Sequence, residues 1–334
     1  MPALPRISLI TPSYQQAEFL EECLLSVSEQ RYPELEHIVM DGGSTDGSVD
    51  IIERQAHRLS AWSSAKDGGQ SDALNKGLAL STGEVFGWLN SDDALVPGSL
   101  QRVGEAFRND PELLIHGGCI RLREDGVDRT SERLNGTDPF QLFVEPVINQ
   151  PATFFRLGAV RALGGVETHL RYVMDLELWW QLLFRHGSAH MRFEPVELAI
   201  FRLHGASKTV QQQQGFLDET ASLLHGLCRS SGNNDLAEVL ALGYTLRHDL
   251  RPIPATAAHH ALVRSMTVHF LLKWNGTIHT AEQFHLMKAF RRLPMDGVRY
   301  LDGMDRRLPA LHDQLRPANW SLFRLRRKWK HLWT

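Results

Sequence analysis

Apolar and polar positions alternate in blocks along roughly the first 130 residues. Short apolar runs typical of strands lie at 7–10, 35–40, 62–65 and 85–89. Between them, apolar residues recur at helical spacing in 17–30, 46–59 and 71–80. Strands that alternate with helices of about 10–15 residues predict βαβ units and a parallel sheet. We therefore expect an α/β fold with a central, mostly parallel sheet flanked by helices.

The second half of the chain has a different pattern. Segments 113–123, 151–155 and 191–203 are strand-like, 171–186 is helix-like, and the polar tract 211–214 is typical of a linker. Beyond this tract the pattern is mostly helical. We expect an α/β domain at 1–210 and a helical C-terminal region at 211–334.

Composition excludes several classes of protein. The 334 residues are 43% hydrophobic with a net charge of −3, whereas disordered chains are less apolar and more highly charged. A sequence pI of about 6.6 shows no basic excess, so we expect no nucleic-acid partner. No apolar run approaches the roughly 20 residues of a membrane span. Three cysteines form no disulfide framework, which favours a reducing, cytoplasmic location.

The net charge conceals an asymmetry. Residues 320–334 contain five Lys and Arg and no acid, so the rest of the chain carries −8 (−3 minus +5). At helical spacing the apolar residues of this tail share one arc: Leu322, Leu325, Trp329, Leu332 and Trp333. A basic amphipathic helix with tryptophans suits an anionic membrane surface. The alternative is a terminal helix packed on the body of the protein.

Polar residues gather where the predicted strands of the α/β half end. Thr11, Tyr14, Asp41, Asp67 and Asp92 each follow a strand. Ligands of open α/β sheets bind at this edge, so the set predicts a binding site. Any single Asp could instead cap a helix.

Two strand-end segments have distinct chemistry. Asp41 precedes two glycines that permit a tight turn and close ligand approach, and its carboxylate could accept bonds from a nucleobase or ribose. The spacing matches neither a P-loop nor a dinucleotide-binding fingerprint. Asp92 and Asp93 are adjacent carboxylates, which repel each other unless a cation or hydrogen bonds compensate. They predict a Mg²⁺ or Mn²⁺ site, or else a turn with a helix cap.

Two later residues are further candidates. Asp175 lies near the start of a predicted helix beside Trp179 and Trp180, so it could be a general base in a partly dry sugar-binding site. Alternatively, it complements the helix dipole and the tryptophans belong to the core. His204 follows an apolar stretch and precedes a glycine turn, and we take it as a second candidate metal ligand beside Asp92.

In order and spacing, these clusters resemble family 2 glycosyltransferases, among them those of bacterial surface polysaccharide biosynthesis. The resemblance covers about residues 5–205 and rests on the segments at 7–14, 21–27, 41–48, 67–77 and 90–93. Residues 149–155 (NQPATFF) resemble a segment that would border the acceptor in polysaccharide-building relatives.

The resemblance implies a Rossmann-like glycosyltransferase-A fold and inverting transfer of one sugar from a nucleotide sugar, with a UDP-sugar as the expected donor. It implies donor contacts from Thr11, Pro12, Tyr14, Asp41, Asp67, Lys76, Ser91, Asp92 and Asp93. Asp92 would hold Mn²⁺ or Mg²⁺, and Asp175 falls where the family has its catalytic base.

This chain departs from the family pattern at two positions. The Asp-x-Asp motif begins with Asn90, and Met174 replaces the Glu that usually precedes the base. The Gln-x-x-Arg-Trp motif of processive synthases is absent, which favours addition of a single sugar to a glycan or lipid-linked acceptor. Surface polysaccharide or glycolipid synthesis is the expected setting.

Two other functions are alternatives to sugar transfer. A non-catalytic relative could bind nucleotide or glycan and act as a scaffold, but Asp41, Asp92 and Asp175 are retained. A sugar-nucleotide pyrophosphorylase would need an N-terminal Gly-rich loop with an Arg, which residues 11–16 do not provide. For 211–334, the alternatives are acceptor binding, membrane contact on the inner face of the cytoplasmic membrane, and homo-oligomer formation.

Overall fold

The computed structural model describes residues 3–136, 138–205, 212–275 and 280–301, together with 306, 307, 309, 310 and 315. The chain forms two compact units. The first contains residues 1–137 and 147–213, and the second contains 138–146 and 214–334. A short segment of the first half therefore belongs to the second unit, which local sequence patterns did not indicate. The basic tail at 320–334 lies outside the described residues.

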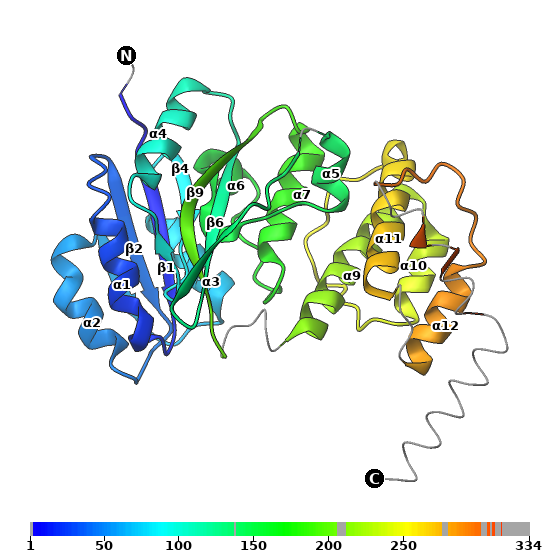
Figure 1. The fold of residues 1–334 in the computed structure, drawn as a ribbon, viewed down its shortest axis with the longest axis horizontal. Coiled ribbons are helices and arrows are strands. Elements are labelled where there is room, and N and C mark those ends of the chain that lie inside the picture. Colours follow the sequence, from blue (N-terminus) through cyan, green and yellow to red (C-terminus); the bar gives the residue numbers. More distant parts are fainter. Residues whose placement is uncertain are drawn as a thin grey trace, which may run out of the picture. The chain divides into compact units, whose positions relative to one another are not determined.

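The first unit is built on a nine-stranded mixed sheet of order β3-β2-β1-β4-β8-β6-β9-β5, with β7 paired to β6 (Figure 1). The strands are β1 (Ile7–Ser13), β2 (Leu35–Asp41), β3 (Ala61–Ser64), β4 (Val85–Trp88), β5 (Ala94–Leu95), β6 (Ile115–Glu124), β7 (Val127–Ser131), β8 (Thr153–Arg156) and β9 (Met191–Leu203). The run β3-β2-β1-β4 is parallel, whereas β8, β5 and β7 pair antiparallel to their neighbours. The expected α/β fold class with a C-terminal helical region is confirmed.

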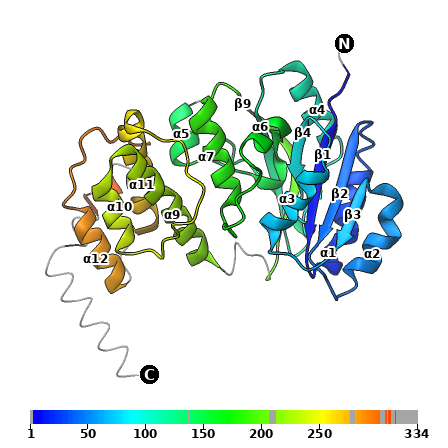
Figure 2. The same cartoon turned by 180° about the vertical axis from the view of Figure 1, so that it is seen from behind.

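Helices cover both faces of this sheet, because successive strand residues point to opposite sides. In β1, Leu9 packs in a cluster with Cys23 of α1 (Ala17–Ser28) and Phe107 of α4 (Ser99–Asn109). On the other face, α3 (Gln70–Leu80) packs on β1 and β2 and is seen from behind in Figure 2. The remaining helices of this unit are α2 (Ser48–Gln55), α6 (Leu157–Ala162) and α7 (Met174–His186).

Two elements differ from the sequence prediction. The helix expected over 46–59 ends at Gln55 and continues as a 3₁₀ turn, Ala56–Arg58. The strand expected to stop before Thr11 runs on through Pro12 to Ser13. Pairing of β1 with β4 ends at Ile10, so the side on which Pro12 lacks an N–H has no strand partner there.

The second unit is helical. Its described elements include α5 (Pro139–Val144), α9 (Gln213–Ser231), α10 (Asn234–Ala241), the 3₁₀ turn Ala257–His259, α11 (His260–Asn275) and α12 (Ala281–Phe290). Helix α11 is buried from Val263 to Leu272 without interruption, as expected of a central helix. Among the described residues, no helix combines the length and apolar character needed to cross a membrane.

Segment 138–146 is held in the second unit by several contacts. The Arg299 guanidinium lies 4.4 Å from the centre of the Phe140 ring and donates to the Asp138 carboxylate at 2.7 Å. Lys273 pairs with Glu145 at 3.4 Å. Asn135, just before this segment, exchanges two hydrogen bonds with the backbone of Val147, just after it. These bonds hold the two ends of the segment together.

Candidate active site

The ends of β1 and β2 and the loop after β3 meet around Gly42. A Cβ atom at Gly42 would lie 3.2 Å from Cδ2 of Tyr14 and 3.3 Å from both carboxylate oxygens of Asp67. Tyr14 is 62% exposed. An exposed aromatic ring and a carboxylate that flank a residue without a side chain suit a flat, polar ligand such as a nucleobase.

Thr11 and Asp41, by contrast, are buried with their side chains already bonded. The Thr11 hydroxyl lies 3.0 Å from Nε2 of His37, and burial lowers the pKa of this histidine to about 4. Asp41 Oδ2 accepts bonds from the backbone N–H groups of Gly43 and Ser44 and from the Ser64 hydroxyl, and Oδ1 accepts from the Ser44 hydroxyl.

These bonds give Asp41 the role of a brace for the turn after β2. They use most of what a carboxylate can accept. Direct contacts of Thr11, Asp41 and the buried Pro12 with a nucleoside stay predictions.

Lys76 is half-exposed and paired within its own helix. Its Nζ lies 2.9 Å from Asp72, whose carboxylate also accepts from the Gly68 N–H at 2.9 Å. The bond from Gly68, followed by the one from Lys76, lowers the pKa of Asp72. The Lys76 ammonium would have to share or leave Asp72 to reach a diphosphate, so that contact stays a prediction.

The segment after β4 meets the end of β9, because the short strand β5 pairs antiparallel with β9. This pairing brings His204 to Asp92, although 112 positions separate them: Nε2 of His204 lies 3.0 Å from Oδ2 of Asp92. Both side chains are partly exposed, whereas Ser91 is buried. The two residues proposed as metal ligands on sequence grounds are therefore neighbours.

The contact of 3.0 Å is that of a hydrogen bond between an imidazole nitrogen and a carboxylate oxygen. Both groups are also common ligands of divalent cations, although a cation between them would replace this hydrogen bond. Within the described part of the chain, no group of three or more His, Cys, Asp and Glu side chains could hold a metal ion. A cation at this pair would take its other ligands from water and substrate oxygens, as Mg²⁺ sites commonly do.

Asp93, next to Asp92, is buried and has few hydrogen bonds. Its Oδ1 accepts from the Arg202 backbone N–H at 3.0 Å, whereas the buried Oδ2 has no hydrogen-bond partner among the described residues. Burial and, next, the charge of Asp92 raise the pKa of Asp93 well above its ordinary value. Burial likewise raises the pKa of the nearby Cys23 thiol, which donates to the Asn90 carbonyl oxygen at 3.5 Å.

Sequence reasoning missed Arg202, which fixes this segment. Its Nε donates to the Asp92 carbonyl oxygen at 2.9 Å, and a terminal nitrogen donates to Glu22 at 2.6 Å. The guanidinium also lies 4.8 Å from the centre of the Phe19 ring. The only sequence signal was its place two residues before His204.

Asp175 is the second residue of α7 and partly exposed, with Oδ1 accepting from the Leu176 N–H at 2.8 Å. Trp179 and Trp180 are both buried, as the alternative interpretation of this cluster expected. The tryptophans therefore belong to the core, and the role of Asp175 as a base stays a prediction.

The loop that leads into α7 is anchored to α3. Asn75 exchanges two hydrogen bonds of 2.8 Å with the backbone of Val166, and the Ser71 hydroxyl donates to the Leu170 carbonyl at 2.9 Å. Gly165 has φ of +90°, and a Cβ there would lie 2.4 Å from Oδ1 of Asn75, so only glycine fits. Ser71 and Asn75 thus hold the loop that precedes Asp175 in place, a role that the sequence did not predict.

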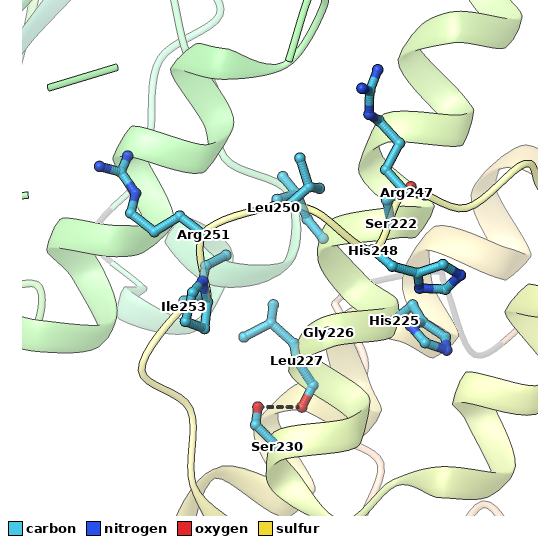
Figure 3. Close-up of a pocket in the computed structure, with 12 residues that line it drawn as sticks. Ser222, His225, Gly226, Leu227, Ser230, Arg247, His248, Leu250, Arg251 and Ile253 are labelled. Carbon is cyan, nitrogen blue, oxygen red and sulfur yellow. Dashed lines mark hydrogen bonds between the residues drawn. The ribbon is translucent and has the colours of Figure 1, made fainter. Parts of the chain in front are cut away.

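A shallow pocket lies in the second unit, under the segment 247–253 that crosses α9 (Figure 3). Its lining includes Leu227, Leu250 and Ile253, with His225 and His248 stacked edge to face at 5.5 Å. Figure 3 shows the Arg247 and Arg251 side chains pointing away from each other. The pocket's lining combines the apolar side chains with the two histidines and with Ser222 and Ser230.

Comparison with known sequences gives consistent matches. The sequence model of the family described as Glycosyl transferase family 2 matches residues 8–193. An uncharacterized glycosyltransferase of Mycobacterium tuberculosis (strain H37Rv) is 32% identical over 185 residues, which cover 53% of this chain and 68% of the relative. The O-antigen biosynthesis protein RfbC of Myxococcus xanthus is 36% identical over 134 residues, or 39% of this chain and 10% of the relative.

Solved structures show the same fold at low sequence identity. S. aureus TarS 1–349, crystallised in complex with UDP-GlcNAc, aligns with a TM-score of 0.59 and 16% identity over 96% of this chain and 89% of that one. The mannosyltransferase PcManGT of Pyrobaculum calidifontis, in complex with GDP-Man and Mn²⁺, aligns with a TM-score of 0.50 and 18% identity, covering 93% and 87%.

Proposed function

The chain belongs to glycosyl transferase family 2, and on that premise we propose that it transfers one sugar from a nucleotide-diphosphate sugar to an acceptor hydroxyl with inversion. The observation that carries the proposal is the arrangement at one sheet edge. The exposed ring of Tyr14 and the carboxylate of Asp67 follow strands β1 and β3 of the parallel run β3-β2-β1-β4. The segment after β4, the last strand of the same run, contains Asp92, which contacts His204.

The donor would lie along this edge. Tyr14 would stack on the base and Asp67 would accept from it, while the turn braced by Asp41 holds Gly42 open for close approach. The donor-side segment then continues to Lys76, the only Lys of α3, as a partner for diphosphate. We propose a UDP-sugar as donor, in keeping with the UDP-GlcNAc complex of TarS.

Asp92 and His204 would hold Mn²⁺ or Mg²⁺, with Ser91 and Asp93 supporting the segment. The adjacency of a carboxylate and an imidazole after β4 and the Mn²⁺ in the PcManGT structure support this assignment. Such a cation would neutralise negative charge that develops on the departing diphosphate.

Asp175 would act as the base. Its carboxylate would take the proton of the acceptor hydroxyl as that oxygen attacks the anomeric carbon from the face opposite the leaving group. Its partial exposure at the start of α7 is compatible with reaching an acceptor, whereas Glu177 on the same helix is buried and bonded to Gln181 at 2.7 Å.

The acceptor proposed is a glycan or lipid-linked sugar of a surface polysaccharide or glycolipid, in keeping with the O-antigen biosynthesis relative. The basic tail would bring the enzyme to an anionic membrane. Truncation after Pro317 should then reduce sedimentation with vesicles that contain phosphatidylglycerol; unchanged sedimentation would remove the membrane role.

The base assignment is tested by a matched pair of variants, Asp175→Asn and Glu177→Gln. We expect Asp175→Asn to lower kcat by about 10³-fold or more while nucleotide-sugar binding, followed by thermal shift, is retained. Glu177→Gln should be far less harmful to kcat. The opposite ranking would move the base to Glu177.

The metal assignment is tested by Asp92→Ala and His204→Ala in the presence and absence of Mn²⁺. Both should weaken the Mn²⁺-dependent part of donor binding. Binding of a nucleotide sugar without any transfer, across a panel of donors and acceptors, would favour the non-catalytic scaffold instead.

A further inference from the structure

Three side-chain amides form a continuous chain across the site. Nε2 of Gln70 donates to Oδ1 of Asn90 at 2.6 Å, and Nδ2 of Asn90 donates to Oε1 of Gln150 at 3.0 Å. Nε2 of Gln150 then donates to the carbonyl oxygen of Trp88 at 2.7 Å. All three side chains are partly buried.

The direction of this chain is fixed by its end. A backbone carbonyl can only accept, so Gln150 must present its NH₂ group to Trp88 and its oxygen to Asn90. Asn90 must then turn its NH₂ group toward Gln150 and its oxygen toward Gln70. Each amide therefore has one orientation, and each needs both a donor and an acceptor.

The three residues come from separate parts of the fold. Gln70 is the first residue of α3, after the loop that contains Asp67. Asn90 follows β4 and precedes Asp92, and Gln150 begins the 3₁₀ turn Gln150–Ala152. The preceding Asn149 anchors this last segment to the Gly118 carbonyl at 2.8 Å.

We propose that Asn90 is a positioning residue, the centre of an amide chain that sets Gln150 and its segment against the donor side of the site. This proposal rests on the proposed function. The amide of Asn90, at the first position of the Asp-x-Asp motif, then serves to bond Gln70 and Gln150 and is not a weakened metal ligand. The cation site is left to Asp92 and His204.

A carboxylate cannot take this position in the chain. Aspartate at 90 could still accept from Gln70, but it would place an oxygen 3.0 Å from the oxygen of Gln150. It would also add a further carboxylate beside Asp92 and the buried Asp93. Gln150 could restore a donor only by rotating its NH₂ group away from the Trp88 carbonyl, which loses the terminal bond.

The decisive variants are Asn90→Asp and Gln150→Glu, which each replace one amide donor at nearly constant shape. Gln15→Glu is the matched control, because it adds the same charge near this sheet edge. The Gln15 side chain bonds to Thr45, and its backbone N–H donates to the Ser44 hydroxyl, so neither bond involves the amide chain. Gln150 belongs to segment 149–155, which is expected to border the acceptor. We therefore expect the first two to lower kcat/KM for the acceptor about tenfold or more, with donor KM and the Mn²⁺ activation constant within about threefold. Gln15→Glu should change kcat/KM less than about threefold.

The double variant Asn90→Asp with Gln150→Glu should lower kcat/KM for the acceptor no more than the worse single variant does. Either single substitution already breaks the amide chain, so the two losses should not multiply. Multiplicative losses would overturn the proposal. Tighter Mn²⁺ activation or faster transfer in Asn90→Asp would also overturn it, since both are expected of a restored metal ligand.

A second measurement separates this proposal from the proposed function. In a cycle of Asn90→Ala, Gln150→Ala and the double variant, the unfolding equilibrium constants should be coupled by about fivefold or more, whether or not any donor is turned over. Coupling without transfer activity would support the amide chain and contradict the proposed sugar transfer. Transfer activity without coupling would support sugar transfer and contradict the amide chain.

Discussion

Asp41 and Asp93 are strand-end carboxylates of the same sheet, and each is only 2% exposed, yet their surroundings are opposite. Asp41 accepts four hydrogen bonds on its two oxygens, from Gly43, Ser44 and Ser64. Asp93 accepts one bond within hydrogen-bond distance, from the Arg202 backbone, and the neighbouring Asn90 side chain lowers its pKa by a weaker interaction.

The difference separates two uses of a buried acid. A fully bonded carboxylate stabilises the turn that carries it, and its removal leaves several donors unsatisfied. A carboxylate with an unbonded oxygen next to a second acid costs free energy in the folded state. The turn after β2 is therefore held by the carboxylate of Asp41, whereas the segment after β4 contains a buried carboxyl group with few hydrogen bonds next to Asp92.

The largest expected effect is on the braced side. Asp41→Ala leaves the N–H groups of Gly43 and Ser44 and two hydroxyls without their acceptor, so we expect a loss of about 3–5 kcal/mol in the free energy of unfolding. Urea denaturation followed by tryptophan fluorescence measures it. A loss below about 1 kcal/mol would contradict the bracing role.

A pH effect of intermediate size is expected at His37, also on β2. Its folded pKa of about 4 lies below the usual 6.5, so between these values the unfolded chain binds a proton that the folded chain does not. The contribution of His37 to the free energy of unfolding is therefore fully present above pH 6.5. It falls by at most about 3 kcal/mol as the pH is lowered toward 4.

The measurement compares urea midpoints of the parent and His37→Gln from pH 7 to pH 4.5. The variant should show a flatter dependence on pH than the parent. Parallel curves would mean that His37 is protonated in the folded protein or does not titrate in this range. The buried His116, whose pKa burial also lowers to about 4, contributes equally to both curves.

The smallest effect on stability is expected at Asp93. Asp93→Ala removes one bond from the Arg202 N–H together with a buried group that repels Asp92, so we expect a change within about 1 kcal/mol in the free energy of unfolding. Because Asp41→Ala removes an equal volume at equal burial, the difference between the two variants reports the lost hydrogen bonds of Asp41 together with the relieved repulsion at Asp93. Equal losses would end the distinction between the two strand ends.

Local patterns predicted most elements of the first unit because strand and helix periodicities are properties of short segments. They failed where tertiary pairing overrides them, as in the continuation of β1 through Pro12. They also gave no sign that segment 138–146 belongs to the second unit, since its partners Arg299 and Lys273 lie far along the chain.

The sequence by itself determined the α/β fold class, the acids at strand ends and the family, because alternating elements and Asp-Gly turns are encoded locally. Only the tertiary structure decided what each polar group does. Antiparallel pairing of β5 with β9 sets His204 beside Asp92, and the sheet order brings Gln70, Asn90 and Gln150 into one chain. Such contacts depend on which distant strands lie side by side, and no window of the sequence contains both partners.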